Sequence, residues 1–211
     1  MWSDNIRIMT SKPPSVDSAQ SRASAGRPKG PSAFYGASVE YGLHAVLWLL
    51  SEHPKRASSR DLADMQGLPA AMLAKVMQKL EKAGIVSSSG GITGGYELAR
   101  LASDISVGDV VDAIEGDRRL FDCKEVRRGC ILFGGHPPAW SVDGVCRIHA
   151  VMLRAEKRMR AELAKTSLAD LARGGRPPEF EAQVVDWFRD RGKARETARI
   201  SAVKEGRRSP R

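Results

Sequence analysis

The sequence predicts a mainly α-helical fold with a small β-hairpin and one long helix suited to pairing. Apolar residues recur at helical spacing in several segments between residues 38 and 116. Within residues 85–98 a glycine-rich tip separates two short stretches that contain apolar residues, which is typical of a β-hairpin. From residue 146 onward an apolar stripe alternates spacings of three and four over about four turns, as in helices that pair with one another.

Composition places the chain among proteins with a real hydrophobic core. It has 211 residues, 42% of them hydrophobic, which is enough for one domain or two small ones. No apolar run reaches the ~18 residues that a membrane-spanning helix needs, so we expect no membrane partner. The first 33 residues contain no apolar segment of the kind found in secretory signals, and we therefore expect a cytoplasmic protein.

The net charge of +9 is concentrated at the two ends of the chain. Residues 1–33 hold five basic residues against two acidic ones, and residues 173–211 hold eleven against six. The first segment is rich in Ser, Pro, Gly and Ala, which predicts a disordered basic arm. The second predicts a basic C-terminal tail with one short helix at residues 179–190. Such ends favour a polyanionic partner, although charged tails can also serve only to keep a protein in solution.

Two helices around a tight turn are predicted after a first helix at residues 38–51. Ser58 followed by Asp61 resembles a capping box at the start of the second helix. Gly67 suits the turn, and Pro69 suits the first position of the third helix because its missing N–H would be unpaired there. A β-hairpin at residues 85–98 and a short helix at residues 105–116 follow.

The third helix, residues 69–82, is predicted to have one buried and one outward face. The buried stripe comprises Met72, Leu73, Val76, Met77 and Leu80, and the outward residues are Ala70, Ala71, Ala74, Lys75, Gln78 and Lys79. Helix, helix, turn, helix and hairpin in this order are typical of a winged helix-turn-helix, so residues 34–116 are predicted to bind double-stranded DNA.

The third helix is expected to enter the major groove. Arg60, Lys75 and Lys79 are placed for phosphates, and Gln78 is the outward side chain suited to a base edge. The lysines could equally form an ordinary solvated helix face. The predicted DNA-binding residues, including those of the hairpin tip, are Arg60, Ala70, Ala71, Ala74, Lys75, Gln78, Lys79, Gly91, Thr93 and Gly94.

All three cysteines lie in one glycine- and proline-rich stretch, and residues 117–146 are predicted to form a sensor loop. Cys123, Cys130 and Cys146 are followed by His149 in a C-x6-C-x15-C-x2-H pattern. In a cytosolic protein such a cluster indicates a metal site or a redox-active site rather than disulfides. Nearby basic residues would favour thiolates and hence a thiol switch. No oxyanion-type motif accompanies the Cys–His pair, so an enzyme is not expected.

The segments "EYGLHAVLWL", "LEKAGIVSSSGGITGGYELAR" and "ISVGDVVDAIEG" resemble the Rrf-two family of bacterial winged-helix regulators. The resemblance covers about residues 36–172 and implies a homodimeric transcription regulator, often a repressor. The apolar spacing predicts one long helix up to residue 172, and this segment resembles the family's dimerisation helix with a short ending after it, so residues 147–172 are expected to join two subunits. The residues predicted to pair are Ile148, Met152, Ala155, Met159 and Leu163.

Several members of this family carry an iron–sulfur cluster on three cysteines and respond to redox state or nitric oxide. The resemblance implies a 2Fe–2S cluster on Cys123, Cys130 and Cys146. His149 is the expected fourth ligand, with Glu40 of the other subunit as the alternative. The middle cysteine spacing is longer than in the family. A clusterless thiol switch, a signal-independent regulator and a zinc-stabilised protein-interaction module therefore stay open as alternatives.

The wing departs from the family in one position. Members commonly place an arginine just before the first glycine of the tip, whereas this chain has Gly90 there. We expect a basic residue of the N-terminal arm, Arg22, Arg27 or Lys29, to supply the missing minor-groove contact.

Overall fold

The computed structural model describes residues 33–50, 55–91, 94–116 and 118–206. Four residues predicted to contact DNA, Arg22, Arg27, Lys29 and Thr93, lie outside these ranges. The chain divides into residues 1–34 and residues 35–211, and the second unit contains all the described helices and strands. Among the described residues, no helix has both the length and the apolar character needed to cross a membrane.

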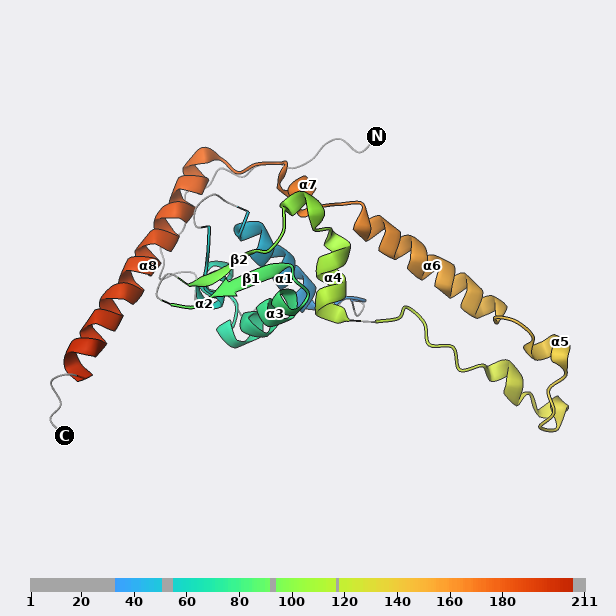
Figure 1. Cartoon of the computed structure of the whole chain (residues 1–211). Coiled ribbons are helices and arrows are strands. Elements are labelled where there is room, and N and C mark those ends of the chain that lie inside the picture. The colour runs from blue at the N-terminus through green and yellow to red at the C-terminus, as the bar shows by residue number, and fades with distance from the viewer. Residues whose placement is uncertain (1–32, 51–54, 92–93, 117, 207–211) are drawn as a thin grey trace, which may run out of the picture. The chain divides into compact units, whose positions relative to one another are not determined.

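The predicted fold class is confirmed, because the described chain is mainly helical with a two-stranded antiparallel hairpin (Figure 1). The longer helices and the strands are α1 Ala37–Trp48, α2 Ser59–Gln66, α3 Ala70–Lys82, β1 Val86–Ser89, β2 Gly95–Leu98, α4 Val107–Glu115, α6 Arg147–Ala164 and α8 Pro178–Gly206. The short helical elements are η2 Ala102–Asp104, η3 Val126–Gly129, η4 Ile131–Phe133, α5 Ala139–Val142 and α7 Leu168–Ala172.

The turn between α2 and α3 forms as its local chemistry predicts. Ser58 precedes α2, and its hydroxyl accepts the Asp61 N–H at 3.1 Å. Gly67 adopts a left-handed conformation (φ 64°), which a residue without Cβ reaches easily. The Leu68 N–H then bonds to the Ala63 carbonyl at 2.9 Å, which closes the turn and directs α3 across α2.

One continuous core joins the helix-turn-helix to the elements that follow it. Buried side chains come from α1, α2, α3, β1 and α4, and further ones from α7 and α8. They include Val46, Leu62, Leu73, Met77, Leu80, Val86, Val110, Ile114, Leu168, Val184 and Phe188. The prediction that Met72 belongs to this core is wrong, since its side chain is 44% exposed. Leu73, Val76, Met77 and Leu80 fill the stripe, and Met72 lies about 100° around the helix from Leu73.

The hairpin is attached to the start of α2 as well as being paired with itself. Val86 pairs with Leu98 and Ser89 with Gly95. Ala57, just before α2, exchanges two backbone hydrogen bonds with Tyr96 of β2, of 3.1 and 2.9 Å. The wing is therefore held beside the N-terminal end of α2.

The predicted single helix at residues 147–172 breaks into two, so this prediction is wrong in detail. α6 ends at Ala164, and Ser167 begins α7 by forming a capping box with Asp170. The Val107 N–H bonds to the Thr166 carbonyl at 2.8 Å, and the Leu168 N–H bonds to the Ile105 carbonyl at 2.8 Å. These bonds tie the break to the start of α4, and a straight helix could not make them.

Candidate nucleic-acid interface and cysteine loop

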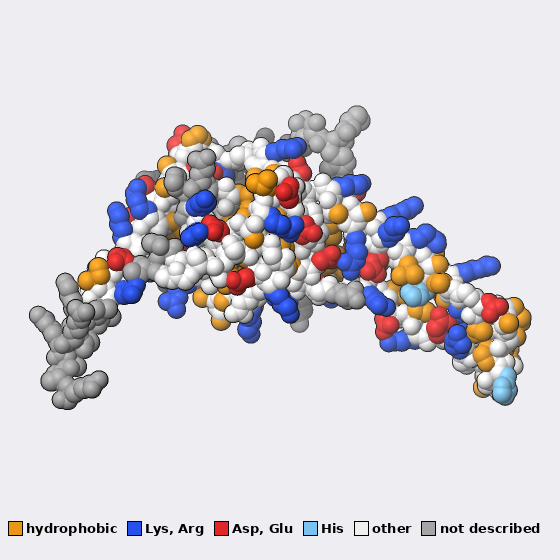
Figure 2. All heavy atoms as spheres, viewed as in Figure 1, with side chains coloured by type: hydrophobic (Ala, Val, Ile, Leu, Met, Phe, Trp, Pro, Cys, Tyr) orange, Lys and Arg blue, Asp and Glu red, His pale blue; other side chains and the backbone are white. Residues whose placement is uncertain are grey.

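One face of α3 is buried in the core, and the opposite face forms a narrow exposed surface. Ala71, Met72, Lys75 and Gln78 are exposed, whereas the predicted contact residues Ala70 and Ala74 are half-buried. Lys and Arg side chains project from the lower edge of the molecule in Figure 2, where Figure 1 places α3. Met72 was missed as a surface residue by sequence reasoning, because its apolar side chain at helical spacing resembles a core residue.

The two lysines of α3 differ in what they contact. The Lys79 ammonium donates to the Ile114 carbonyl at 2.5 Å, near the C-terminal end of α4. A cation is favourable at that end of a helix, where carbonyls lack intrahelical partners. Lys75 makes no ion pair with any residue that the structure describes. Lys75 is therefore available to a ligand, while Lys79 is engaged in joining α3 to α4.

The remaining predicted contact residues lie at the edges of this surface. Arg60 is exposed in the first turn of α2. Gly91 has φ 101° at the hairpin tip, a conformation that favours glycine, and the Gly94 N–H bonds to its carbonyl at 3.2 Å. This hydrogen bond joins the two glycines across the tip of the wing.

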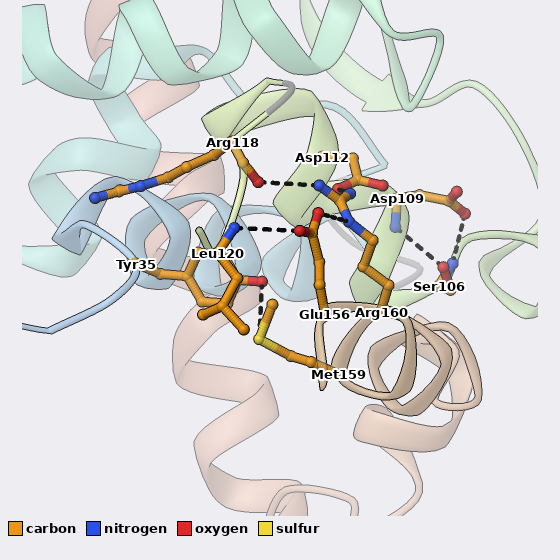
Figure 3. Close-up of polar contacts among 9 residues, drawn as sticks. All are labelled: Tyr35, Ser106, Asp109, Asp112, Arg118, Leu120, Glu156, Met159 and Arg160. Atoms are coloured by element: carbon orange, nitrogen blue, oxygen red, sulfur yellow. Dashed lines mark hydrogen bonds and ion pairs between the residues drawn. The ribbon is translucent and has the colours of Figure 1, made fainter. Parts of the chain in front are cut away.

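Arg160 on α6 connects α4 to the start of the cysteine loop (Figure 3). Its guanidinium forms an ion pair with Asp112 of α4 at 2.6 Å and another with Glu156 at 3.2 Å. It also donates to the Arg118 carbonyl at 3.0 Å, while Glu156 accepts the Leu120 N–H at 3.3 Å. The loop therefore begins from a fixed point on α4 and α6. Sequence reasoning missed this residue, because Asp112 and Arg118, which it joins, lie far away in the sequence.

Glu115 fixes the same region from the other side. Its carboxylate accepts the Gly36 N–H at 2.9 Å and pairs with Arg118 at 2.8 Å. The Gly36 hydrogen bond, and then the Arg118 guanidinium, hold the pKa of Glu115 below its ordinary value. The start of α1 and the end of α4 are joined in this way directly before the cysteine loop.

Two of the three cysteines share a pocket in the loop. Cys130 and Cys146 both line a cavity of about 610 Å³ together with Phe133, Trp140 and Arg127. The Arg127 guanidinium pairs with Glu125 at 2.7 Å and donates to the Gly144 carbonyl at 2.6 Å, which holds both sides of the loop together. All three cysteines are half-buried free thiols.

Cys146 has the environment that most favours a thiolate. It precedes the first residue of α6, at the N-terminal end of that helix. The nearby backbone N–H groups of His149, and then of Ile148, with a smaller contribution from the charge of Arg127, lower the pKa of the Cys146 thiol. Cys123 instead contacts a Glu125 carboxylate oxygen through its sulfur at 3.7 Å.

The predicted cluster ligands do not form a metal site within the single chain. Among the described residues, no group of three or more His, Cys, Asp or Glu side chains is arranged to hold a metal ion. Glu40 is exposed on α1 and lines a different pocket, with Tyr41 and His44. Among the described residues of one chain, Cys123, Cys130, Cys146 and His149 are therefore not brought together as a single ligand set.

The apolar stripe predicted on α6 is largely uncovered. α6 has no fully buried side chain along its 18 residues. Ile148 is 64% exposed and Ala155 is exposed, while Met152 and Met159 are half-buried. Leu163, near the end of the helix, packs against the core. The N-terminal part of the stripe is therefore not covered by the part of the chain that the structure describes.

The sequence matches the Rrf2 family, described as iron-dependent transcriptional regulators, over residues 35–174. It is 34% identical over 171 residues to proteins of two Mycobacterium tuberculosis strains named as HTH-type transcriptional regulators, covering 81% of this chain and 97% of the relatives. It is 37% identical over 123 residues to protein rrf2 of Nitratidesulfovibrio vulgaris, covering 58% of this chain and 74% of that protein.

A solved structure shows the same fold. CymR, the global cysteine regulator of B. subtilis, superposes with a TM-score of 0.52 at 22% identity, over 69% of this chain and all of that chain (100%). The likeness at this identity concerns the fold alone. The family match and the M. tuberculosis relatives together show which family the chain belongs to. The chain belongs to the Rrf2 family, whose members are transcriptional regulators rather than enzymes.

Proposed function

We propose that the protein is a cytoplasmic homodimeric repressor that binds duplex DNA through α3. The observation that carries this proposal is the division of α3 into two faces. Leu73, Val76, Met77 and Leu80 anchor it in the core, and Ala71, Met72, Lys75 and Gln78 remain outside, next to a glycine-tipped wing. The family match to transcriptional regulators supports the same function.

In this function four exposed residues of α3 have roles that follow from their chemistry. Ala71 allows close approach of the helix to the floor of the major groove, and Met72 offers apolar contact to a thymine methyl group. The Gln78 amide suits the paired donor and acceptor of adenine, and Lys75 suits a phosphate. The wing tip at Gly91 and Gly94 approaches the neighbouring backbone.

The uncovered stripe on α6 supports dimerisation. A second copy packed along Ile148, Met152, Ala155 and Met159 would remove apolar surface from water and place two copies of α3 on one duplex. Residues 34–116 then read DNA, residues 117–146 sense a signal, and residues 147–172 join the subunits. Because the cysteine loop connects the reading part to the pairing part, a change in the loop alters the spacing of the two α3 helices.

Substitutions on α3 test the DNA-binding proposal. Lys75→Ala is expected to weaken binding to every duplex. It should also lower the slope of log K against log salt concentration by about one, because one phosphate contact is lost. Gln78→Ala is expected to cost about 1–3 kcal/mol on the preferred sequence only. Fluorescence anisotropy with duplexes from the protein's own upstream region and with random duplexes measures both.

Lys165→Ala is the matched control. Lys165 follows the last residue of α6, is exposed, and forms an ion pair with Glu162 of that helix. Its binding constant and salt dependence should equal those of the unaltered protein. If the unaltered protein binds neither duplex even at low salt, DNA is not its partner.

For the signal, we propose a 2Fe–2S cluster on Cys123, Cys130 and Cys146, with His149 or the other subunit's Glu40 as fourth ligand. The description of the family as iron-dependent supports iron. A thiol switch is the second candidate, supported by the lowered pKa of Cys146 and by Cys130 in the same pocket. Because the described residues of one chain do not bring these ligands together, we attribute no step of the mechanism to the cluster.

Metal analysis and DNA binding of one anaerobic preparation separate these candidates. A cluster predicts iron, sulfide and visible absorption that are lost when all three cysteines are changed to serine. A thiol switch predicts a colourless, metal-free protein whose DNA affinity changes with hydrogen peroxide and recovers with dithiothreitol. Zinc without iron would indicate a zinc-stabilised module. A metal-free protein that is unaffected by peroxide would contradict both proposals.

A further inference from the structure

α8 is a helix that packs against the helix-turn-helix, although it lies beyond residues 35–174, where the family match ends. Val184 and Phe188 are buried in the core that contains α1, α2 and α3. Near the start of α8, the Phe180 ring lies 6.3 Å from the Trp48 ring of α1, measured between centroids. The sequence predicted a shorter helix at residues 179–190 within a basic tail, and the observed helix continues to Gly206.

Two arginines of α8 bind the two carboxylates of α2. Arg191 pairs with Asp61 at 3.4 Å and also with Asp64, and Arg195 pairs with Asp61. Asp61 is only 2% exposed, so its charge is compensated within the protein. Carboxylates on the first helix of a DNA-binding motif would otherwise repel phosphates, because that helix crosses the DNA backbone. α8 thus neutralises the two carboxylates of α2, which would otherwise repel the DNA backbone.

The same row of α8 contains a third arginine. Arg191, Arg195 and Arg199 are spaced four residues apart, so they share one face, and each step advances about 6 Å along the helix. Arg191 reaches both Asp64 and Asp61, whereas Arg195 reaches Asp61 alone. The row therefore runs toward the N-terminal end of α2, and Arg199 lies one step further.

Arg199 has no acidic partner at that position. It is exposed and forms no ion pair with any described residue. The residues of α2 before Asp61, and those directly preceding the helix, are Arg56, Ala57, Ser58, Ser59 and Arg60, none of which is acidic. Arg60 is exposed at the same end of α2, and Ala57 is paired with Tyr96 of the wing.

We infer that α8 is an additional DNA-contacting element, in which Arg191 and Arg195 fix the helix on α2 and Arg199 binds a backbone phosphate beside Arg60 and the wing. This inference rests on the proposed DNA-binding function. Lys and Arg side chains project along α8 in Figure 2, and the sequence after Arg199 adds Lys204, Arg207, Arg208 and Arg211 against Glu205. A phosphate contact of this kind raises affinity for any sequence and adds no base preference.

Removal of the Arg199 charge in the full-length protein tests the inference. Arg199→Ala is expected to weaken binding to both upstream and random duplexes by about three- to tenfold at ~0.1 M salt, and to lower the salt slope by about one. Arg199→Lys should keep the slope, because it keeps the charge. Arg189→Ala is the control on the same helix: Arg189 pairs with Asp186 at 2.6 Å and with Asp190 at 3.8 Å.

The outcomes separate this inference from the proposed function. If Arg199→Ala retains the full salt slope while Lys75→Ala lowers it, α8 only stabilises the fold and the inference is wrong, although the protein still binds DNA. If Arg189→Ala lowers the slope as much as Arg199→Ala does, the effect is one of net charge and the specific contact is excluded. If the unaltered protein does not bind DNA at all, the proposed function itself is wrong.

Discussion

Replacement of Leu73 by alanine is expected to lower the free energy of unfolding by about 2–5 kcal/mol. The Leu73 side chain is fully buried in the first turn of α3, against the other helices of the core. Its truncation removes apolar contacts and leaves a cavity that the surrounding backbone fills only partly. Chemical denaturation followed by circular dichroism, at one fixed protein concentration, measures the change.

Met72→Ala is the matched comparison on the same helix. Met72 is 44% exposed, so its truncation should change the free energy of unfolding by less than about 1 kcal/mol. The same substitution should weaken DNA binding, because Met72 lies on the proposed reading face. Equal losses of stability in the two variants would show that α3 buries a different face from the one described.

Gly95→Ala should both destabilise the protein and weaken its DNA binding by tenfold or more, because the wing is held against α2 at this residue. A Cβ atom at Gly95 would lie 2.7 Å from the carbonyl carbon and oxygen of Ala57 and 3.0 Å from the Ser58 nitrogen. These are backbone atoms, so the conflict cannot be relieved by rotating a side chain. The wing must move away from α2, with loss of the two Ala57–Tyr96 hydrogen bonds, at a cost of about 1–3 kcal/mol.

Gly90→Ala in the same hairpin is the control for this substitution. A Cβ atom at Gly90 meets no described atom within 4 Å, and its φ is not positive. The free energy of unfolding should then change by no more than about 0.5 kcal/mol. Thermal melts of both variants, with anisotropy measurements on one duplex, provide the comparison. A Gly95→Ala protein as stable as the Gly90→Ala protein would contradict the described wing attachment.

Local chemistry made the helix-turn-helix and the wing predictable. Ser58 as a cap, Gly67 in the turn and the glycine-rich hairpin tip each act through residues a few positions away. The break between α6 and α7 had a local signal as well, since Ser167 and Asp170 form the S-x-x-D pattern of a capping box. The periodicity across the break concealed it, because an apolar stripe continues on both sides.

Contacts between distant residues decided what the sequence left open. Asp61 looks like the second residue of a capping box, yet its carboxylate binds Arg195, which lies 134 positions away. Lys79 looks like a phosphate ligand, yet its ammonium caps α4 at Ile114. Neither contact can be predicted from the sequence pattern of a single segment. The cysteine spacing likewise predicted a set of ligands that the single chain does not bring together.

The order of helices, turn and hairpin was therefore determined by the sequence alone, because hydrogen-bond capping, backbone conformation and apolar periodicity act within one or two turns of chain. Only the tertiary structure decided which charged groups are left for DNA, because a lysine or arginine is available to a phosphate only when no carboxylate or carbonyl elsewhere in the fold has already bound it. Lys75 and Arg199 meet that condition among the described residues, and Lys79, Arg191 and Arg195 do not.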